Sequence, residues 1–211
     1  MIPKQLSKVF MLAGVIVLAV LLKDYLYPKT VQETPSEAVS MEFPLKDGNY
    51  VVIQSGPAQG LTGPIHQTSQ EKYALDIIKG LRLRDLFKKT TPTLGTPVYS
   101  PCKGNVRKMR DGLPDMPTGQ RDPQNGTGNH VVVGCDQFDV LLAHLKKDSI
   151  TVKEEQIVKI GELLGEIGNS GNSDGPHLHL AATRTDKEGN VTALPMVFNG
   201  WYLQKGDHFS N

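Results

Sequence analysis

The sequence predicts a mainly β fold in one folded domain. Of its 211 residues, 21 are glycine and 14 are proline, and only 6% are aromatic. This composition favours turn-rich β structure over a helical bundle. From residue 43 onward, short alternating or β-branched runs recur between turn-forming residues, as expected for successive strands. The runs are NYVVIQ, KYALDII, TPVYSP, GNVRKM, NHVVVGC, DVLLAHL, ITVKE, QIVKI, LLGEIG, PHLHLAAT and NVTALP.

The first 27 residues form a separate segment. Residues 9–22 (VFMLAGVIVLAVLL) carry no charge and are preceded by two lysines. The run is short for a spanning helix, which needs about 20 residues, and matches the apolar region of a signal peptide. Continuing it through Tyr27 adds the interfacial aromatics of an anchor. We therefore expect a cytoplasmic N-terminus at 1–8, a transmembrane signal-anchor at 9–27 and the rest of the chain outside. A cleaved signal is the alternative.

The remaining chain divides by composition. Residues 28–42 (PKTVQETPSEAVSME) are polar and contain two prolines, which indicates a linker. The domain is expected at 43–205, with a tail at 206–211. Within the domain, residues 81–89 (LRLRDLFKK) fit either a short helix or an extended crossover. Residues 111–129 hold three prolines and four glycines and predict a long surface loop.

Charge and cysteine content narrow the setting. The chain has 23 basic and 22 acidic residues, and this balance gives no electrostatic reason to expect a nucleic acid partner. Both cysteines, Cys102 and Cys135, lie in the part expected outside the membrane, where a disulfide is permitted. Closing that loop would stabilise the fold by about 3 to 4 kcal/mol. Two buried thiols are the alternative.

The segment PHLHL places two histidines two residues apart. In a strand, residues i and i+2 lie on the same face about 7 Å apart, whereas a helix turns them away from each other. We therefore predict a strand in which His177 and His179 face one point and Leu178 faces the core. Two converging imidazoles can bind a metal or divide the work between metal binding and proton transfer. Two solvated histidines are the alternative.

Three further ionisable residues make solvated histidines a poorer explanation. Asp76 lies in the apolar run KYALDIIKG, where a carboxylate is costly to bury unless it is paired or bound to a cation. His144 closes the apolar run DVLLAHL, and His66 follows a Gly-Pro turn. Zinc accounts for the set, since a catalytic zinc site uses three protein ligands and keeps a fourth position for water. The remaining histidines would carry protons, which is the chemistry of amide hydrolysis.

Two other histidines are not expected in the site. His130 lies in the run NHVVVGC and has no ionisable partner at i+2, so we interpret it as structural. His208 is three residues from the last residue of the sequence and is expected to be solvated.

In several motifs the sequence resembles the lysostaphin-type (LytM-like) zinc metallopeptidases, which cut peptide cross-links of bacterial cell walls. The resemblance covers roughly residues 43–180. The matching motifs, in chain order, are His66 followed by YALDI, GTPVYSP with Gly104, GNHVV, AHL around His144, the glycines of IGELLGEIGNSGN, and PHLH ending at His179.

Carried over position by position, the resemblance implies that His66, Asp76 and His179 bind one Zn²⁺. It also implies that His144 and His177 act on the water and the transition state. The sequence departs from the family in having nine residues between His66 and Asp76 where three are usual, which we attribute to a longer loop. The acidic pair at 154–155 stands where a glycine turn is common.

The family's fold is an antiparallel barrel-sandwich hybrid, a duplicated hybrid motif with an active-site groove. The run IVKIGELLGEIG also resembles the hammerhead turn of biotinyl and lipoyl carriers, but the carriers' lysine-bearing hairpin is missing. The resemblance thus implies a zinc endopeptidase that acts on peptidoglycan peptides in the bacterial cell envelope. A non-catalytic relative that binds cell wall or activates a hydrolase is the main alternative. A peptidase acting on a protein or bacteriocin is another.

Overall fold

The computed structural model describes residues 34–56, 58–60, 63–65, 68–80 and 93–211. These residues form strands joined by turns, with two short 3₁₀ helices, η1 (Ser69–Glu71) and η3 (Pro123–Asn125). The mainly β prediction is confirmed. The expected anchor at 9–27 and the ambiguous segment at 81–89 lie outside these ranges, and within them no helix is long and apolar enough to cross a membrane.

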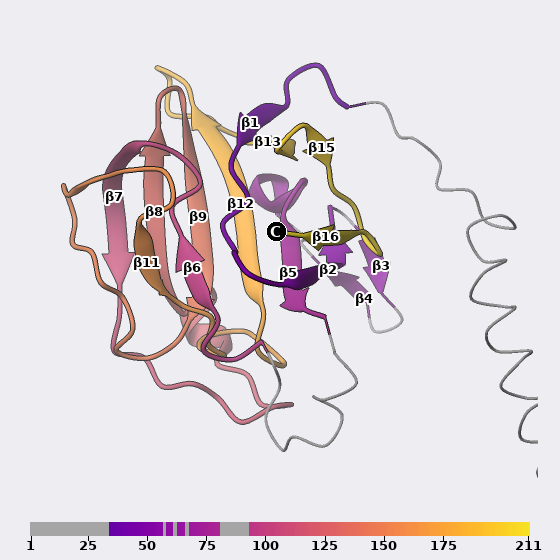
Figure 1. Cartoon of the computed structure of the whole chain (residues 1–211), viewed down its shortest axis with the longest axis vertical. Coiled ribbons are helices and arrows are strands. Elements are labelled where there is room, and N and C mark those ends of the chain that lie inside the picture. Colours follow the sequence, from indigo (N-terminus) through magenta and orange to yellow (C-terminus); the bar gives the residue numbers. More distant parts are fainter. Residues whose placement is uncertain (1–33, 57, 61–62, 66–67, 81–92) are drawn as a thin grey trace, which may run out of the picture. The chain divides into compact units, whose positions relative to one another are not determined.

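One large sheet forms the central part of the described domain. Its strands β7, β8, β9 and β12 run side by side, and β12 is paired with β9 on one edge and with β5 on the other (Figure 1). On the same edge as β5, the C-terminal half of β12 pairs with β13. In order across the sheet the strands are β10 (Ile157–Val158), β7 (Gly104–Arg110), β8 (Asn129–Cys135), β9 (Phe138–Leu145), β12 (Leu178–Thr185), β5 (Leu75–Lys79), β2 (Asn49–Ser55) and β16 (His208–Ser210), with β13 (Val191–Leu194) beside β12.

Smaller sheets complete the fold. Strands β6 and β11 pair with each other, and their buried residues Val98 and Leu164 belong to the same apolar core as the large sheet. Strand β1 lies parallel to β14, which pairs with β15. The bounds are β1 (Val39–Met41), β3 (Ala58–Gly60), β4 (Gly63–Ile65), β6 (Pro97–Tyr99), β11 (Leu163–Glu166), β14 (Met196–Phe198) and β15 (Trp201–Tyr202), where β3 pairs with β4.

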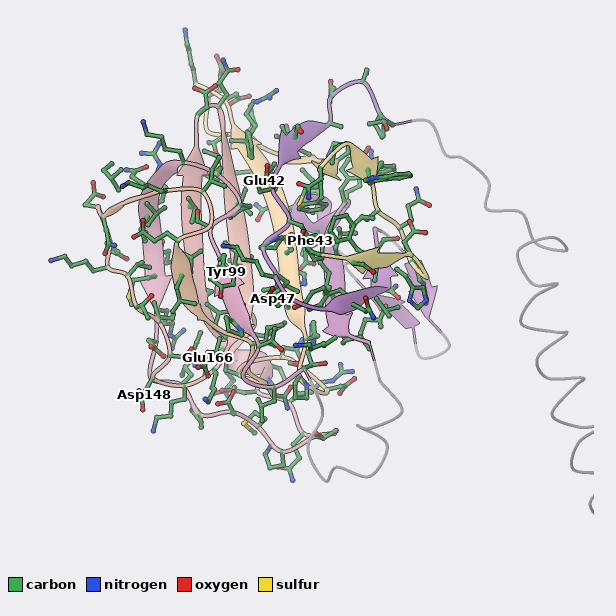
Figure 2. The ribbon with its side chains drawn as sticks, in the orientation of Figure 1. Glu42, Phe43, Asp47, Tyr99, Asp148 and Glu166 are labelled. Atoms are coloured by element: carbon green, nitrogen blue, oxygen red, sulfur yellow. A yellow bond between two sulfur atoms is a disulfide. The ribbon has the colours of Figure 1, made fainter. Side chains whose placement is uncertain are left out.

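An aromatic cluster joins the ends of the domain to its middle. The ring of Phe43, labelled in Figure 2, lies 4.3 Å from that of Phe209 and 5.6 Å from those of Tyr50 and Phe198. Aromatic rings at these separations attract one another in addition to the apolar area that they bury. The cluster therefore holds β2, β14 and β16 together across long stretches of sequence.

The described domain extends further in both directions than the sequence suggested. Strand β1 lies within the expected linker at 28–42, and it pairs with β14. Strand β16 lies within the expected tail at 206–211, where its backbone pairs with β2. Both short runs depend on partners far away in the sequence, so local pattern alone could not reveal them. The run ITVKE was also wrongly predicted as a strand, since its residues have no ladder partner.

Cys102 and Cys135 are joined in a disulfide, with their Cα atoms 5.9 Å apart. Cys135 ends β8 and is buried, and Cys102 packs partly against the same core in the turn before β7. The disulfide joins the turn before β7 to the end of β8. Of the two alternatives left open by the sequence, the disulfide is the one that the structure contains.

Candidate metal centre

Asp76 and His179 face each other across strands β5 and β12. The antiparallel register pairs them directly, and Asp76 Oδ1 lies 2.8 Å from His179 Nδ1. Their neighbours Ile77 and Leu178 are fully buried in the core. Because successive strand residues alternate between faces, the core leucines and isoleucines leave Asp76 and His179 together on the opposite face. Both side chains are nonetheless buried, with 11% and 6% exposure.

His144 reaches the same face through a β-bulge. Asn129 pairs with Leu145 and Val131 with Leu142, so the single β8 residue between them opposes two residues of β9. Within the bulge, His144 adopts a left-handed backbone conformation with φ of 60°. A bulge redirects the side chain that it contains. Plain alternation would send His144 to the core side with Leu142, and the extra residue turns it instead toward His177 and His179.

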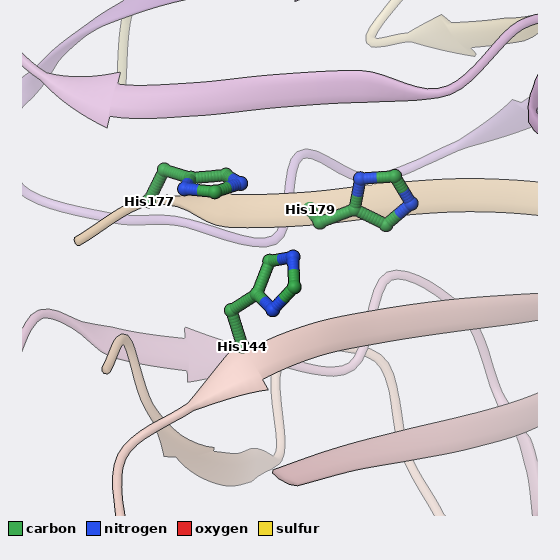
Figure 3. Close-up of side chains that lie close together, drawn as sticks. All are labelled: His144, His177 and His179. Carbon is green, nitrogen blue, oxygen red and sulfur yellow. The ribbon is translucent and has the colours of Figure 1, made fainter. Parts of the chain in front are cut away.

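The three histidine rings converge from β9, which carries His144, and from β12 and the residue just before it, which carry His179 and His177 (Figure 3). The ring centre of His144 lies 4.8 Å from that of His177 and 5.7 Å from that of His179. One ligand nitrogen from each ring lies within 4.8 Å of the other two. This is a spacing at which imidazoles can share one metal ion or one chain of proton transfer.

Backbone carbonyls fix the protonation pattern of two of these rings. His144 Nδ1 lies 2.8 Å from the carbonyl oxygen of Ser170, and His177 Nδ1 lies 2.8 Å from that of Gly175. A carbonyl only accepts, so each Nδ1 must carry the hydrogen and donate it. In the neutral rings, the Nε2 atoms are therefore the acceptors.

Burial, followed by the neighbouring His177 and His179 rings, lowers the pKa of His144 to about 3. Removing an imidazolium from water is costly, and two nearby rings that can also become positive add repulsion. His144 is therefore neutral at pH 7, with Nε2 able to accept a proton.

The donor set fits a metal cation. His177 Nε2 lies 3.5 Å from Asp76 Oδ1, so a neutral ring would turn a lone pair toward the carboxylate. Two acceptors at this distance repel each other unless a proton or a cation lies between them. Ligand atoms around a tetrahedral zinc lie roughly 3.3 Å apart, given bonds of about 2.0–2.1 Å. The Asp76–His179 contact would need to open by only about half an ångström.

The structure thus brings together four of the five residues implied by the resemblance: Asp76, His144, His177 and His179. The fifth, His66, lies outside the described residues. The three histidines also form a ligand set of their own within the described residues.

The two histidines excluded on sequence grounds lie elsewhere. His130 is buried in β8, where its Nδ1 contacts the carbonyl oxygen of Gly128 at 2.8 Å and the hydroxyl of Thr127 at 3.1 Å. Burial lowers its pKa. His208 is exposed on β16.

Sequence reasoning missed polar residues that surround the site. Asn169 and Ser173 are buried beside His177, in the segment that precedes the two histidines. Gln54 is also buried, and a bulge in β2 pairs it with Asp76. Its Nε2 has no hydrogen-bond partner within the described part of the chain. Two features of the sequence could have indicated these residues: the Asn and Ser residues concentrated just before the two histidines, and Gln54 at the end of the run NYVVIQ.

Comparison with known proteins finds a family match for about half of the chain. Residues 89–191 match the model of peptidase family M23, a stretch that contains His144, His177 and His179. An uncharacterized metalloprotease of Haemophilus influenzae is 35% identical over 86 residues, which is 40% of this chain. The match spans only 15% of that relative's length.

Several solved structures are similar to the chain at low identity. They include the catalytic domain of the prophage-encoded M23 protein EnpA from Enterococcus faecalis, at 22% identity and a TM-score of 0.47, covering 71% of this chain and 92% of that one. The catalytic domain of lysostaphin from Staphylococcus simulans matches at 19% identity and a TM-score of 0.42, covering 69% and 85%. A zinc-containing peptidase from Vibrio cholerae matches at 21% and 0.43, covering 74% of this chain and 39% of that one.

None of these three scores reaches 0.5, so the resemblance rests on the family match and on the sequence motifs. With PHLH at the start of β12 and AHL at the end of β9, the region between residues 89 and 191 matches peptidase family M23 and resembles the lysostaphin-type (LytM-like) peptidases.

Proposed function

We propose that this protein is a zinc-dependent endopeptidase that hydrolyses amide bonds in peptidoglycan peptides outside the cell membrane. The observation that carries the proposal is the meeting of Asp76, His144, His177 and His179 on one face of the sheet, with Asp76 Oδ1 2.8 Å from His179 Nδ1. The match to a peptidase family supplies the reaction class.

Asp76 and His179 would hold the zinc, with His66 as the third ligand on the strength of the sequence resemblance. A bound Zn²⁺ would serve there as a Lewis acid toward a scissile carbonyl and a water molecule. We favour this trio over the three histidines because it leaves His144 and His177 available for proton transfer. The carboxylate among its ligands also balances part of the metal's charge.

His144 and His177 supply the proton chemistry. His144 is kept neutral by burial, so its Nε2 can accept a proton from the attacking water. The same low pKa makes the protonated ring a ready donor to the leaving amine. His177 presents Nε2 to the same centre, because Gly175 holds its Nδ1 on the other side. The two carbonyl contacts hold the rings in their reactive orientation before the substrate binds.

The disulfide and the expected N-terminal segment point to the same compartment. Disulfides persist in oxidising environments outside the cytoplasm, and Cys102–Cys135 packs against the core. We propose that residues 9–27 direct the domain across the membrane and anchor it in the bacterial cell envelope. We further propose that the described strands form the barrel-sandwich hybrid implied by the resemblance, with the metal centre in its groove.

The test is mass spectrometry of purified peptidoglycan digested by the full chain. Wild-type protein should release peptide fragments, and chelator should abolish the release. Asp76→Ala and His144→Ala should each lower the rate by at least about 100-fold, since general acid–base catalysis alone contributes about 10²–10⁴-fold. The matched control is His208→Ala, which removes an exposed histidine outside the site. Equal products from all four proteins, or wall binding without cleavage by any, would show a non-catalytic relative instead.

A further inference from the structure

The predicted surface loop at 111–129 is fastened to the segment that carries the catalytic histidines. Asp115 pairs with Ser170 in an isolated antiparallel bridge, and its carboxylate accepts hydrogen bonds from the backbone N–H groups of Lys147 and Asn169. The backbone N–H of Met116 donates to the carbonyl of Asn169 at 2.9 Å. We call residues 111–129 the rim loop. These contacts make it a fixed wall of the site.

A second set of contacts closes the far end of the rim loop. The backbone N–H of Gly119 donates to the carbonyl of Asp174 at 2.7 Å, and that of Asp122 donates to Gly171 at 2.9 Å. The guanidinium of Arg121 also forms a two-point ion pair with the Asp174 carboxylate. The hydrogen bond from Arg121 lowers the pKa of Asp174, so the pair stays charged. The rim loop thus follows residues 169–174 along their length.

A chain of side-chain hydrogen bonds leads from this wall to His177. Asn169 Nδ2 donates to the carbonyl of Met116 at 2.6 Å. The Ser173 hydroxyl oxygen lies 2.7 Å from Asn169 Oδ1 and 3.2 Å from His177 Nδ1. The hydroxyl hydrogen goes to Asn169 Oδ1 or to the carbonyl of Gly175, 2.9 Å away. In both cases the Ser173 oxygen is left to accept from the His177 Nδ1–H. Asn169 and Ser173 are 2% and 1% exposed, so water does not compete for these contacts.

We propose that Asn169 and Ser173 are positioning residues that fix the His177 ring and its Nδ1–H tautomer, and that the rim loop holds them in place through Met116. His177 keeps 13% of its side chain exposed and lies just before β12. Its ring therefore depends on local contacts for orientation. The Gly175 carbonyl supplies one of them and Ser173 supplies the second, sharing the same hydrogen. This role rests on the proposed function of His177.

Ser173→Ala removes the link while leaving the backbone intact. Loss of a supporting partner of a site residue typically costs about 10–100-fold in activity. We expect kcat on peptidoglycan peptides to fall by about that factor, with KM within about twofold, because Ser173 acts through a catalytic ring. The matched control is Ser100→Ala. Ser100 is also 1% exposed, and its hydroxyl donates to a carbonyl, that of Cys102, away from the site.

Asn169→Ala should have the same effect as Ser173→Ala, and the double variant should be no worse than either alone. Two residues that act through one path are not additive. An additive double variant, or a Ser173→Ala protein whose kcat matches that of Ser100→Ala, would overturn the proposal.

A measurement without turnover separates this proposal from the proposed function. In the full chain labelled with ¹⁵N-histidine and treated with chelator, long-range ¹H–¹⁵N spectra report which ring nitrogen carries hydrogen. The His177 signals are identified by their loss in His177→Gln. Ser173→Ala should shift the His177 tautomer ratio toward Nε2–H by about fivefold, whereas Ser100→Ala should leave it unchanged. An unchanged ratio in Ser173→Ala overturns the positioning role even if the protein proves inactive on peptidoglycan. A shifted ratio in an inactive protein rejects only the proposed function.

Discussion

Reducing the disulfide should destabilise the domain by an amount set by its loop. Cys102 and Cys135 are 33 residues apart. The chain-entropy relation for a loop of that length gives about 3.7 kcal/mol at 25 °C. Reduction leaves both sulfur atoms in the core, so packing changes little and the loop term dominates. Urea unfolding of wild-type protein with and without reductant, under otherwise identical conditions, should show this difference in free energy.

The double variant Cys102→Ala/Cys135→Ala is the control for the reductant. Its unfolding curve should be the same with and without reductant, and its stability should lie near that of reduced wild type or below it, because the lost sulfur atoms leave small cavities. Thiol titration confirms that reduction is complete. A fully reduced wild type that unfolds at the same urea concentration as the oxidised protein would refute the reasoning.

Two further predictions concern the pKa of His144 and the packing of the rim loop. With a pKa near 3 in the fold against 6.5 unfolded, His144 stabilises the metal-free fold above pH 6.5 and loses that contribution as the pH falls toward 3. Chelated wild type should therefore lose about 3 kcal/mol more than His144→Asn between pH 7 and pH 4. Asn suits the left-handed backbone at this position. Free energies of urea unfolding that fall equally with pH in the two proteins would contradict the lowered pKa of His144. Gly168→Ala should destabilise by about 1–3 kcal/mol in thermal unfolding, because a methyl group there meets Asp115 and the Lys146 backbone. Gly126→Ala, whose methyl meets open space, is the control, and equal melting of the two variants would speak against the tight packing of the rim loop.

The sequence predicted the parts of the site that depend on local periodicity. The i, i+2 spacing of His177 and His179 and the apolar neighbours of Asp76 follow directly from the alternation of a strand. They needed only the correct secondary structure, and the described structure places them together. The family motifs supplied the division of roles among the five residues, and that division stays a prediction.

What the sequence did not predict depends on long-range pairing. The bulge that turns His144 toward His179 sets one residue of β8 against two of β9, and nothing within DVLLAHL reveals it. The partners of β1 and β16 lie more than 150 residues away along the chain. Asn169 and Ser173 read as turn residues because their burial comes from the rim loop, not from their own neighbours.

Zinc binding by two variants tests the central claim most directly. Equilibrium dialysis of the full chain, followed by metal analysis, should find about one zinc per wild-type chain. Asp76→Asn should weaken binding by at least about tenfold, whereas His144→Asn should retain it, since the account assigns Asp76 to the metal and His144 to proton transfer. Zinc held normally by Asp76→Asn and lost by His144→Asn would place the ion among the three histidines and contradict the account.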